Sequence, residues 1–160
     1  MATVNLSDYQ PLKISDASSF RIGIVVSEWN DFVTDNLRDG ALETLLKEGI
    51  PEDHIKIFNV PGAFELNYAT MQLCKTGYFD AVIAIGCVIR GETPHFDYVC
   101  SAVAQGIKDC NILTDVPAIF CVLTDDTKEQ SIARSGGALG NKGIEAAVTA
   151  MQMVAFKRNL

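Results

Sequence analysis

Near its middle the chain reads Asp80-Ala-Val-Ile-Ala-Ile-Gly-Cys-Val-Ile-Arg-Gly-Glu-Thr-Pro-His-Phe-Asp97. The first part is almost continuously apolar and rich in β-branched residues, which is typical of a strand buried on both faces of a parallel sheet. The second part passes Gly91 and reaches Thr93 and Pro94, which suit the N-cap and the first position of a helix. The stretch therefore predicts a strand, over Asp80–Gly86, that leads through a short loop into a helix.

Similar apolar runs occur on either side of this stretch, and helical patterns separate them. The other predicted strands are Arg21–Val26, Ile55–Val60 and Val116–Leu123. The order β-α-β-α-β-α-β-α-α predicts a single doubly wound, flavodoxin-like α/β domain, with three layers and a four-stranded parallel sheet. The polar first nineteen residues predict an N-terminal arm (1–19), or an additional edge strand, before a domain over 20–160. The predicted helices have apolar stripes over 33–46, 64–73, 96–110, 127–134 and 144–155.

Composition excludes several classes of protein. The 160 residues fit one domain, and the net charge of −7 disfavours binding to nucleic-acid phosphates. No apolar run approaches the about 20 residues that span a bilayer, and no secretory signal pattern is visible, so we expect a cytoplasmic protein that does not bind membranes. The five cysteines form no C-x-x-C pair, which favours buried, reduced thiols over disulfides or a metal site.

In doubly wound sheets, ligands bind at the carboxyl ends of the strands. At the end of the Asp80–Gly86 strand, the backbone N–H groups of Glu92 and Thr93 start a helix, and Gly91 allows close approach of the backbone. This is a candidate site for a single phosphate, although the segment taken alone fits an ordinary capped helix start better. His95 in the first helical turn is a candidate acid/base whose position favours the neutral form; the alternative is a surface histidine.

Two more segments end at the same edge of the sheet. Gly62 and Ala63 offer small residues and backbone N–H groups, and Glu65 can accept hydrogen bonds from hydroxyl groups. The indole of Trp29 offers a plane for stacking a flat heterocycle. Taken singly, these residues also fit a plain helix start and an aromatic side chain that fills a loop.

Cations occur beside the glycine-rich stretch 135–143. Arg134 can hold a phosphate with two parallel hydrogen bonds, and Lys142 adds a point charge. Solvated charges at helix ends are the alternative for both residues. The second histidine, His54, lies in a polar turn, and we expect it to be solvated.

Three strings of residues resemble the lumazine synthase (6,7-dimethyl-8-ribityllumazine synthase) family. They are Val60-Pro-Gly-Ala-Phe-Glu65, Val88-Ile-Arg-Gly-Glu-Thr-Pro-His-Phe-Asp-Tyr-Val99, and Gly140-Asn-Lys-Gly143 following Arg134. The middle string is long and specific, and all three occur in the family's order and spacing. The resemblance covers the chain from about Phe20 to Phe156.

The resemblance implies a role for each candidate residue. His95 moves protons, Arg134 reaches the phosphate of a substrate, and Glu92 and Thr93 bind that phosphate through their N–H groups. Trp29 stands where most members have Phe and stacks on a uracil ring. The ribityl chain contacts Asn30, Gly62, Ala63 and Glu65, the ring contacts Val88 and Ile89, and Phe64 and Gly91 complete the set. A neighbouring subunit supplies Phe120, Lys142 and Arg134.

The implied reaction needs no cofactor. The C5 amine of 5-amino-6-(D-ribitylamino)uracil attacks the ketone of 3,4-dihydroxy-2-butanone 4-phosphate, and a Schiff base forms. Phosphate then leaves, and the ribitylamino nitrogen closes the ring with loss of water. The nucleophile belongs to the substrate, so the enzyme needs no serine or cysteine nucleophile. Riboflavin synthase is the implied pathway partner.

The resemblance also implies a homo-oligomer. Family members form pentamers, and some pack pentamers into a hollow icosahedral shell of sixty chains. The loop Gly136-Gly-Ala-Leu-Gly-Asn141 has the length and glycines of shell-formers, but Ala138 and Leu139 stand in place of Lys and Ala. We expect a shell rather than a free pentamer.

Two other functions fit parts of the pattern. One is a flavin- or lumazine-binding protein on the same scaffold that does not catalyse synthesis, in which Trp29 stacks on the flavin ring. The other is a flavodoxin-like regulatory or redox domain, an argument from fold alone that leaves His95 and Arg134 unexplained.

Overall fold

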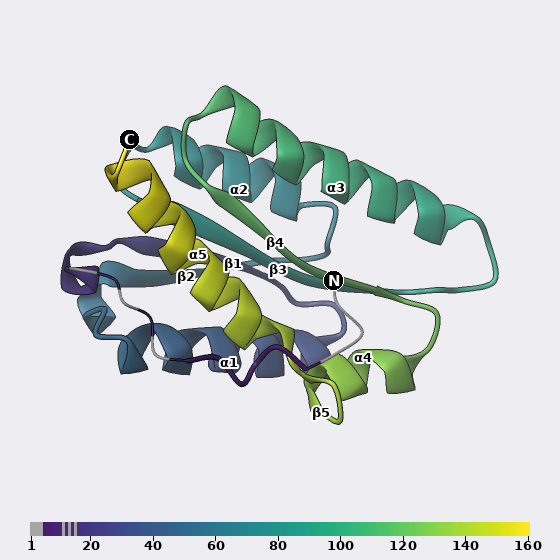
Figure 1. Cartoon of the computed structure of the whole chain (residues 1–160). Coiled ribbons are helices and arrows are strands. Elements are labelled where there is room, and N and C mark those ends of the chain that lie inside the picture. Colours follow the sequence, from purple (N-terminus) through teal and green to yellow (C-terminus); the bar gives the residue numbers. More distant parts are fainter. Residues whose placement is uncertain (1–4, 11, 13, 15) are drawn as a thin grey trace.

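A parallel sheet forms the centre of the molecule in a computed structural model that describes residues 5–10, 12, 14 and 16–160 (Figure 1). All strand pairings in this four-stranded sheet are parallel, and the strand order is β2-β1-β3-β4. The predicted doubly wound α/β fold with a four-stranded sheet is therefore confirmed. The strands are β1 (Ile22–Ser27), β2 (Ile55–Val60), β3 (Ala81–Ile89) and β4 (Ala118–Asp125).

Helices cover both faces of the sheet. The pair α1 (Asp31–Lys47) and α5 (Lys142–Arg158) packs on one face, and α2 (Leu66–Lys75) and α3 (His95–Leu113) pack on the other (Figure 1). The remaining elements are α4 (Lys128–Arg134), β5 (Ser135–Gly137), β6 (Gly140–Asn141), and the 3-10 turns η1 (Ala17–Ser19) and η2 (Glu52–His54). A short antiparallel hairpin, formed by β5 and β6, precedes α5 and was not predicted from the sequence pattern.

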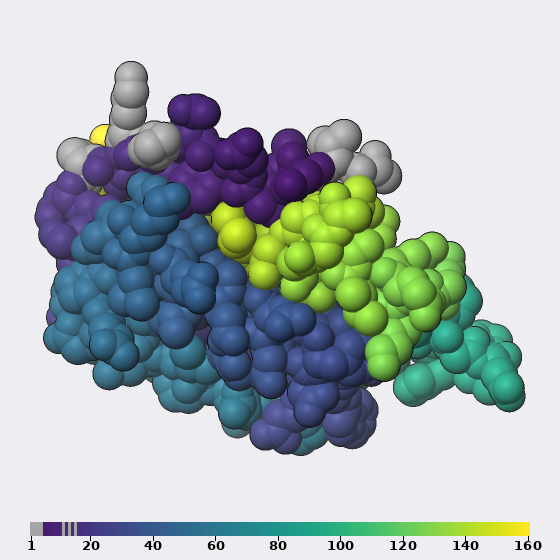
Figure 2. Space-filling model, turned by 90° about the horizontal axis from the view of Figure 1, so that it is seen from below, coloured from purple at the N-terminus to yellow at the C-terminus, as the bar shows by residue number. Residues whose placement is uncertain are grey.

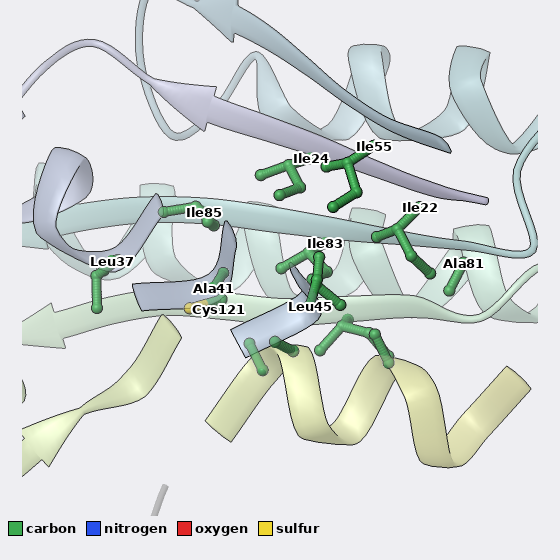
Figure 3. Packing of buried hydrophobic residues seen from close by; sticks show 14 of the residues in the cluster. Ile22, Ile24, Leu37, Ala41, Leu45, Ile55, Ala81, Ile83, Ile85 and Cys121 are labelled. Atoms are coloured by element: carbon green, nitrogen blue, oxygen red, sulfur yellow. The ribbon is translucent and has the colours of Figure 1, made fainter. Parts of the chain in front are cut away.

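Side chains of the central strands form two apolar layers because successive residues of a strand point to opposite faces. Ile22 and Ile24 pack toward α1 and α5, whereas Val25 packs toward α2 and α3. Figure 3 shows the first layer, where Ile83 of β3 lies close to Leu45 of α1. All six residues of β1 are buried, which explains why its sequence is apolar without alternation.

Residues 5–10 of the predicted arm lie along α1 and α5, as the purple segment in Figure 2 shows. The backbone N–H of Leu6 donates to Glu145 Oε1 at 3.1 Å, and Ser7 Oγ donates to the Asn141 carbonyl at 3.0 Å. Tyr9 Oη donates to Glu48 Oε1 at 2.9 Å. The described part of 1–19 forms no strand; its polar groups bond instead to residues in α5 and at the ends of α1 and β6.

Three local expectations were wrong. Helix α3 begins at His95, and Thr93 makes no capping hydrogen bond, because Pro94 at the cap position has nearly helical torsion angles (φ −63°, ψ −3°). Phe64 precedes α2 instead of lying on it, and its side chain is exposed. His54 is half-buried, and its Nδ1 atom is buried with no hydrogen-bond partner in the described part of the chain.

All five cysteines are free thiols. Four of them are buried and Cys100 is half-buried, in agreement with the expected reduced core positions. Within the described residues, no helix is long and apolar enough to cross a membrane.

Candidate active site

A cavity of about 460 Å³ opens at the carboxyl ends of the central strands. Its walls come from the segments that follow β1 and β2, from the end of β3 and from the first turns of α3, which are the segments expected to meet there. The cavity brings together eight of the predicted site residues and two further ones, Cys87 and Val99. The eight are Trp29, Asn30, Ala63, Phe64, Glu65, Val88, Ile89 and His95.

The segment after β1 is held firmly across the top of the sheet. The backbone N–H groups of Glu28 and Trp29 donate to the carbonyls of Val60 and Pro61, at 2.8 and 3.0 Å. Asn30 adopts left-handed backbone angles (φ 62°, ψ 42°), which asparagine tolerates better than most residues. Its Nδ2 donates to the Cys87 carbonyl at 2.9 Å, so three strands together position the loop that carries the indole.

Gly62 lies directly beneath the indole. A Cβ at this position would lie 2.5 Å from Trp29 Cε3, so only glycine allows the ring to lie there. The Gly62 N–H donates to Glu65 Oε2 at 3.1 Å, which fixes the carboxylate beside the same ring. The indole is 66% exposed, and this leaves a face of the ring open to a ligand. An open aromatic plane beside an oriented carboxylate suits a flat heterocycle with hydroxyl groups attached.

His95 enters the cavity from the first turn of α3, at the end of a loop that projects from the body of the molecule (Figure 1). Arg90 organises this loop. Its Nη2 lies 3.0 Å from Asp97 Oδ1, its Nε lies 2.7 Å from Asp126 Oδ1, and its guanidinium covers the Phe96 ring at 4.1 Å. The hydrogen bonds to Asp97 and Asp126 raise the already high pKa of Arg90, so the cation persists.

Arg90 was not among the residues predicted to act at the site. Its signal in the sequence was its place inside the specific middle string, with Asp97 in the first turn of α3. Cys87 was likewise not predicted as a wall of the cavity. Burial raises the pKa of the Cys87 thiol to about 11, so the group stays protonated and is a poor nucleophile at neutral pH.

Seven predicted residues do not line this cavity within one chain. Gly62 supports Trp29 from below, whereas Gly91, Glu92 and Thr93 are exposed on the loop before α3. The other three residues lie outside this cavity. They are Phe120, Arg134 and Lys142.

Phe120 and Lys142 line a second cavity, of about 370 Å³, beside the edge strand β4. The Lys142 side chain is buried, and its Nζ lies 2.6 Å from Glu145 Oε1. Arg134 ends α4, where its Nη1 donates to the Gln130 carbonyl at 2.9 Å. Phe120, Arg134 and Lys142 therefore lie on parts of the chain separate from the cavity that His95 lines.

The fold and the cavity together define a doubly wound α/β protein with a cavity, at the carboxyl edge of its sheet, that suits a small, flat, polar molecule. Residues 19–158 match the family model described as 6,7-dimethyl-8-ribityllumazine synthase.

Curated proteins of that name are similar along nearly the whole chain. The relative from Flavobacterium johnsoniae is 54% identical over 154 residues, which cover 96% of this chain and 81% of the relative. Those from Parabacteroides distasonis and Porphyromonas gingivalis are 53% and 51% identical, and each comparison covers at least 98% of both chains. The chain belongs to the 6,7-dimethyl-8-ribityllumazine synthase family, which is a family of transferases. The resemblance seen in the three strings is thus confirmed.

Proposed function

We propose that this protein condenses 5-amino-6-(D-ribitylamino)uracil with 3,4-dihydroxy-2-butanone 4-phosphate to 6,7-dimethyl-8-ribityllumazine, releasing phosphate and water. The observation that carries the proposal is the cavity with Trp29, Glu65 and His95 on its walls, in a chain that matches the family over residues 19–158. The comparisons lend no support to a flavin-binding protein without catalytic activity.

The cavity residues divide into binding and proton transfer. The uracil ring stacks on the open face of Trp29, and the ribityl hydroxyls bond to Glu65 and Asn30, with Gly62, Ala63 and Phe64 around them. Val88 and Ile89 contact the ring at the end of β3. His95 takes and returns the protons that move as the C5 amine adds to the ketone and water leaves the Schiff base.

Alignment of two substrates supplies the larger part of the acceleration. The attacking amine belongs to one substrate and the ketone to the other, so no covalent bond to the protein is needed. Effective molarities reach about 10⁵–10⁸ M for well-aligned partners, against about 10²–10⁴-fold for a general acid/base. Trp29 and Glu65 are held in place by contacts with Gly62, and fixed walls of this kind favour alignment of the substrates as the larger contribution.

The phosphate of the ketone substrate binds at the start of α3. There the N–H groups of Glu92 and Thr93 lack helical acceptors, and Gly91 keeps the backbone accessible. Arg134 from a neighbouring chain adds a guanidinium, the group that holds phosphate most firmly. This assignment rests on the family's motif together with the exposure of the loop.

A second chain completes the cavity in this proposal. Strand β4 is an edge of the sheet, and Phe120 on it is 38% exposed beside Lys142. Apolar side chains surround this edge, which favours burial against another copy. The exposed ones are Ile112, Leu113, Met153 and Phe156. In the pentamer that the family's assembly implies, Phe120, Arg134 and Lys142 of one chain reach the cavity of its neighbour.

We further propose that the pentamers pack into a sixty-chain shell in the cytoplasm and that riboflavin synthase consumes the product. The short turn between β5 and β6 supports the shell, because it adds no bulk beside α5. Sedimentation in native buffer should show a particle far larger than a pentamer. A single pentamer-sized species across the concentration range would overturn the shell.

The decisive assay mixes purified protein with both substrates and follows the fluorescence of the lumazine and the release of phosphate together. We expect both to appear in step, well above the rate without protein. A folded oligomer that gives no acceleration would refute the enzyme. Riboflavin titration of that oligomer would then test the flavin-binding alternative.

A further inference from the structure

Asp125 is a buried carboxylate at the carboxyl end of β4. The residue is only 7% exposed, and its Oδ2 accepts a hydrogen bond from Ser131 Oγ at 2.9 Å. Its Oδ1 lies 3.7 Å from Arg134 Nη1. Ser131 is completely buried in α4. One side of Asp125 is thus fixed by a hydroxyl group, and the other faces a guanidinium.

This placement needs a reason because burying a charge is costly unless a partner compensates it. The neighbouring Asp126 shows the contrast, since it is exposed and serves a different cation, Arg90. Two consecutive carboxylates therefore hold two arginines. One of these arginines organises the loop that carries His95, and the other is the proposed phosphate ligand.

Arg134 is restrained on two sides. Its Nη1 donates to the Gln130 carbonyl one turn back in α4 and faces Asp125 Oδ1. Both of these contacts are made by Nη1, whereas a guanidinium carries five N–H donors in a planar fork. The Nε and Nη2 donors take no part in these two contacts, so they can donate to an anion while both contacts persist.

The same group also reaches the cavity wall. Cys87 lines the cavity, and its Sγ donates to Ser131 Oγ at 3.5 Å. Burial raises the pKa of the Cys87 thiol, so the thiol keeps the proton that it donates to Ser131. The serine hydroxyl in turn donates its own proton to Asp125. A continuous chain of contacts therefore runs from the end of β3 through α4 to Arg134.

We propose that Asp125, held by Ser131, is a positioning residue that orients the Arg134 guanidinium toward the phosphate of the ketone substrate. This inference rests on the proposed function. It adds Asp125 and Ser131, which lie outside the three strings that resemble the family. Asp125 does not touch substrate; it acts through the arginine.

The main test is Asp125→Asn in the assembled enzyme, with kcat and KM measured for each substrate. Asparagine keeps the shape and one hydrogen-bonding oxygen but removes the charge that faces Arg134. We expect the KM for the ketone phosphate to rise about tenfold and the KM for the aminouracil to change less than about twofold. The matched control is Glu129→Gln, which removes an exposed carboxylate from α4, the helix that carries Arg134, and should leave both values unchanged.

A double-mutant cycle with Arg134→Lys separates positioning from general stability. If Asp125 acts through the guanidinium, Asp125→Asn should have little further effect on the phosphate-substrate KM once lysine replaces Arg134. The same tenfold loss in both backgrounds would overturn the proposal. So would a lower KM in Asp125→Asn, because it would mean that the carboxylate competes with phosphate.

Ser131→Ala provides the second variant if Asp125→Asn does not assemble. It keeps the carboxylate but removes its hydroxyl donor, and we expect a KM change in the same direction and about threefold in size. No change in a folded Ser131→Ala shell would contradict the role of the serine. An inactive wild-type protein would instead refute the proposed function, so the two failures are distinguishable.

Discussion

His95 and Trp29 line the same cavity but carry different parts of the proposed reaction. The imidazole stands at the start of α3, whereas the indole is fixed by Gly62 beneath it and by Asn30 beside it. Removing the imidazole takes away proton transfer and leaves the walls that align the substrates. A partial loss of activity follows from this arrangement.

For His95→Ala we expect kcat to fall by about 10²–10⁴-fold while the rate stays above that of the uncatalysed mixture. Steady-state fluorescence assays on the folded, assembled variant measure this. Complete loss of activity in such a variant would contradict the division between alignment and proton transfer.

Arg134 and Lys142 should differ in their effect on the phosphorylated substrate. Arg134 has donors left for an anion, whereas Lys142 is 3% exposed and lies 2.6 Å from Glu145. We expect Arg134→Ala to raise the KM for the ketone phosphate by about 10–100-fold and Lys142→Ala to raise it less. Lys142→Ala should also lower the melting temperature, because Glu145 loses its ion-pair partner.

Substrate titrations of the two variants decide this comparison. Equal affinity for the ketone phosphate in the wild type and in Arg134→Ala would rule out the phosphate role of the arginine. A larger effect from Lys142→Ala would reverse the assignment.

At the scale of elements, the contact between α2 and α3 depends on one close approach. Gly106 of α3 faces the Asn67 side chain of α2, where a Cβ would overlap the amide. Asn67 Nδ2 donates to the Ala102 carbonyl at 3.2 Å, which ties the two helices together. This packing holds α3 and therefore the turn that carries His95.

Gly106→Ala should lower the free energy of unfolding by up to about 2 kcal/mol. The overlap with Asn67 costs about 1–3 kcal/mol, and the better helix propensity of alanine offsets about 1 kcal/mol of that. Chemical denaturation measures the change, with Ala104→Ser on the exposed side of the same helix as the control. A stabilised Gly106→Ala would show that Asn67 moves aside at no cost.

At the scale of the whole molecule, the proposed site needs residues from two chains. His95 lines the cavity at the end of β3, whereas Phe120 lies beside a different cavity at the β4 edge. The arrangement predicts that two inactive variants can complement each other within one assembly.

We expect mixed assemblies of His95→Ala and Arg134→Ala chains to recover activity. In random equal mixtures, about a quarter of the sites combine an intact His95 from one chain with an intact Arg134 from its neighbour. The assay compares co-refolded mixtures with the separately refolded variants added together. Activity no higher than the mean of the two variants would show that each site is complete within one chain.

The amino-acid pattern alone was enough to predict the order of strands along the chain and the edge of the sheet where the cavity opens. The apolar runs identified the buried strands because strands covered on both faces cannot alternate polar and apolar residues. The long string around His95 identified the family because its motif residues are contiguous. Local chemistry thus sufficed for the fold and for most of the cavity wall.

Which charges compensate one another became known only from the packing of the folded chain. Arg90 pairs with Asp126, whereas Asp125 faces Arg134 and accepts a hydrogen bond from Ser131. The geometry of these contacts depends on how β3, β4 and α4 meet. No periodicity reports such contacts, because exposed and buried carboxylates look alike in a sequence. The separation of Phe120 and Lys142 from the His95 cavity is likewise a matter of packing, since it depends on which strand lies at the edge of the sheet.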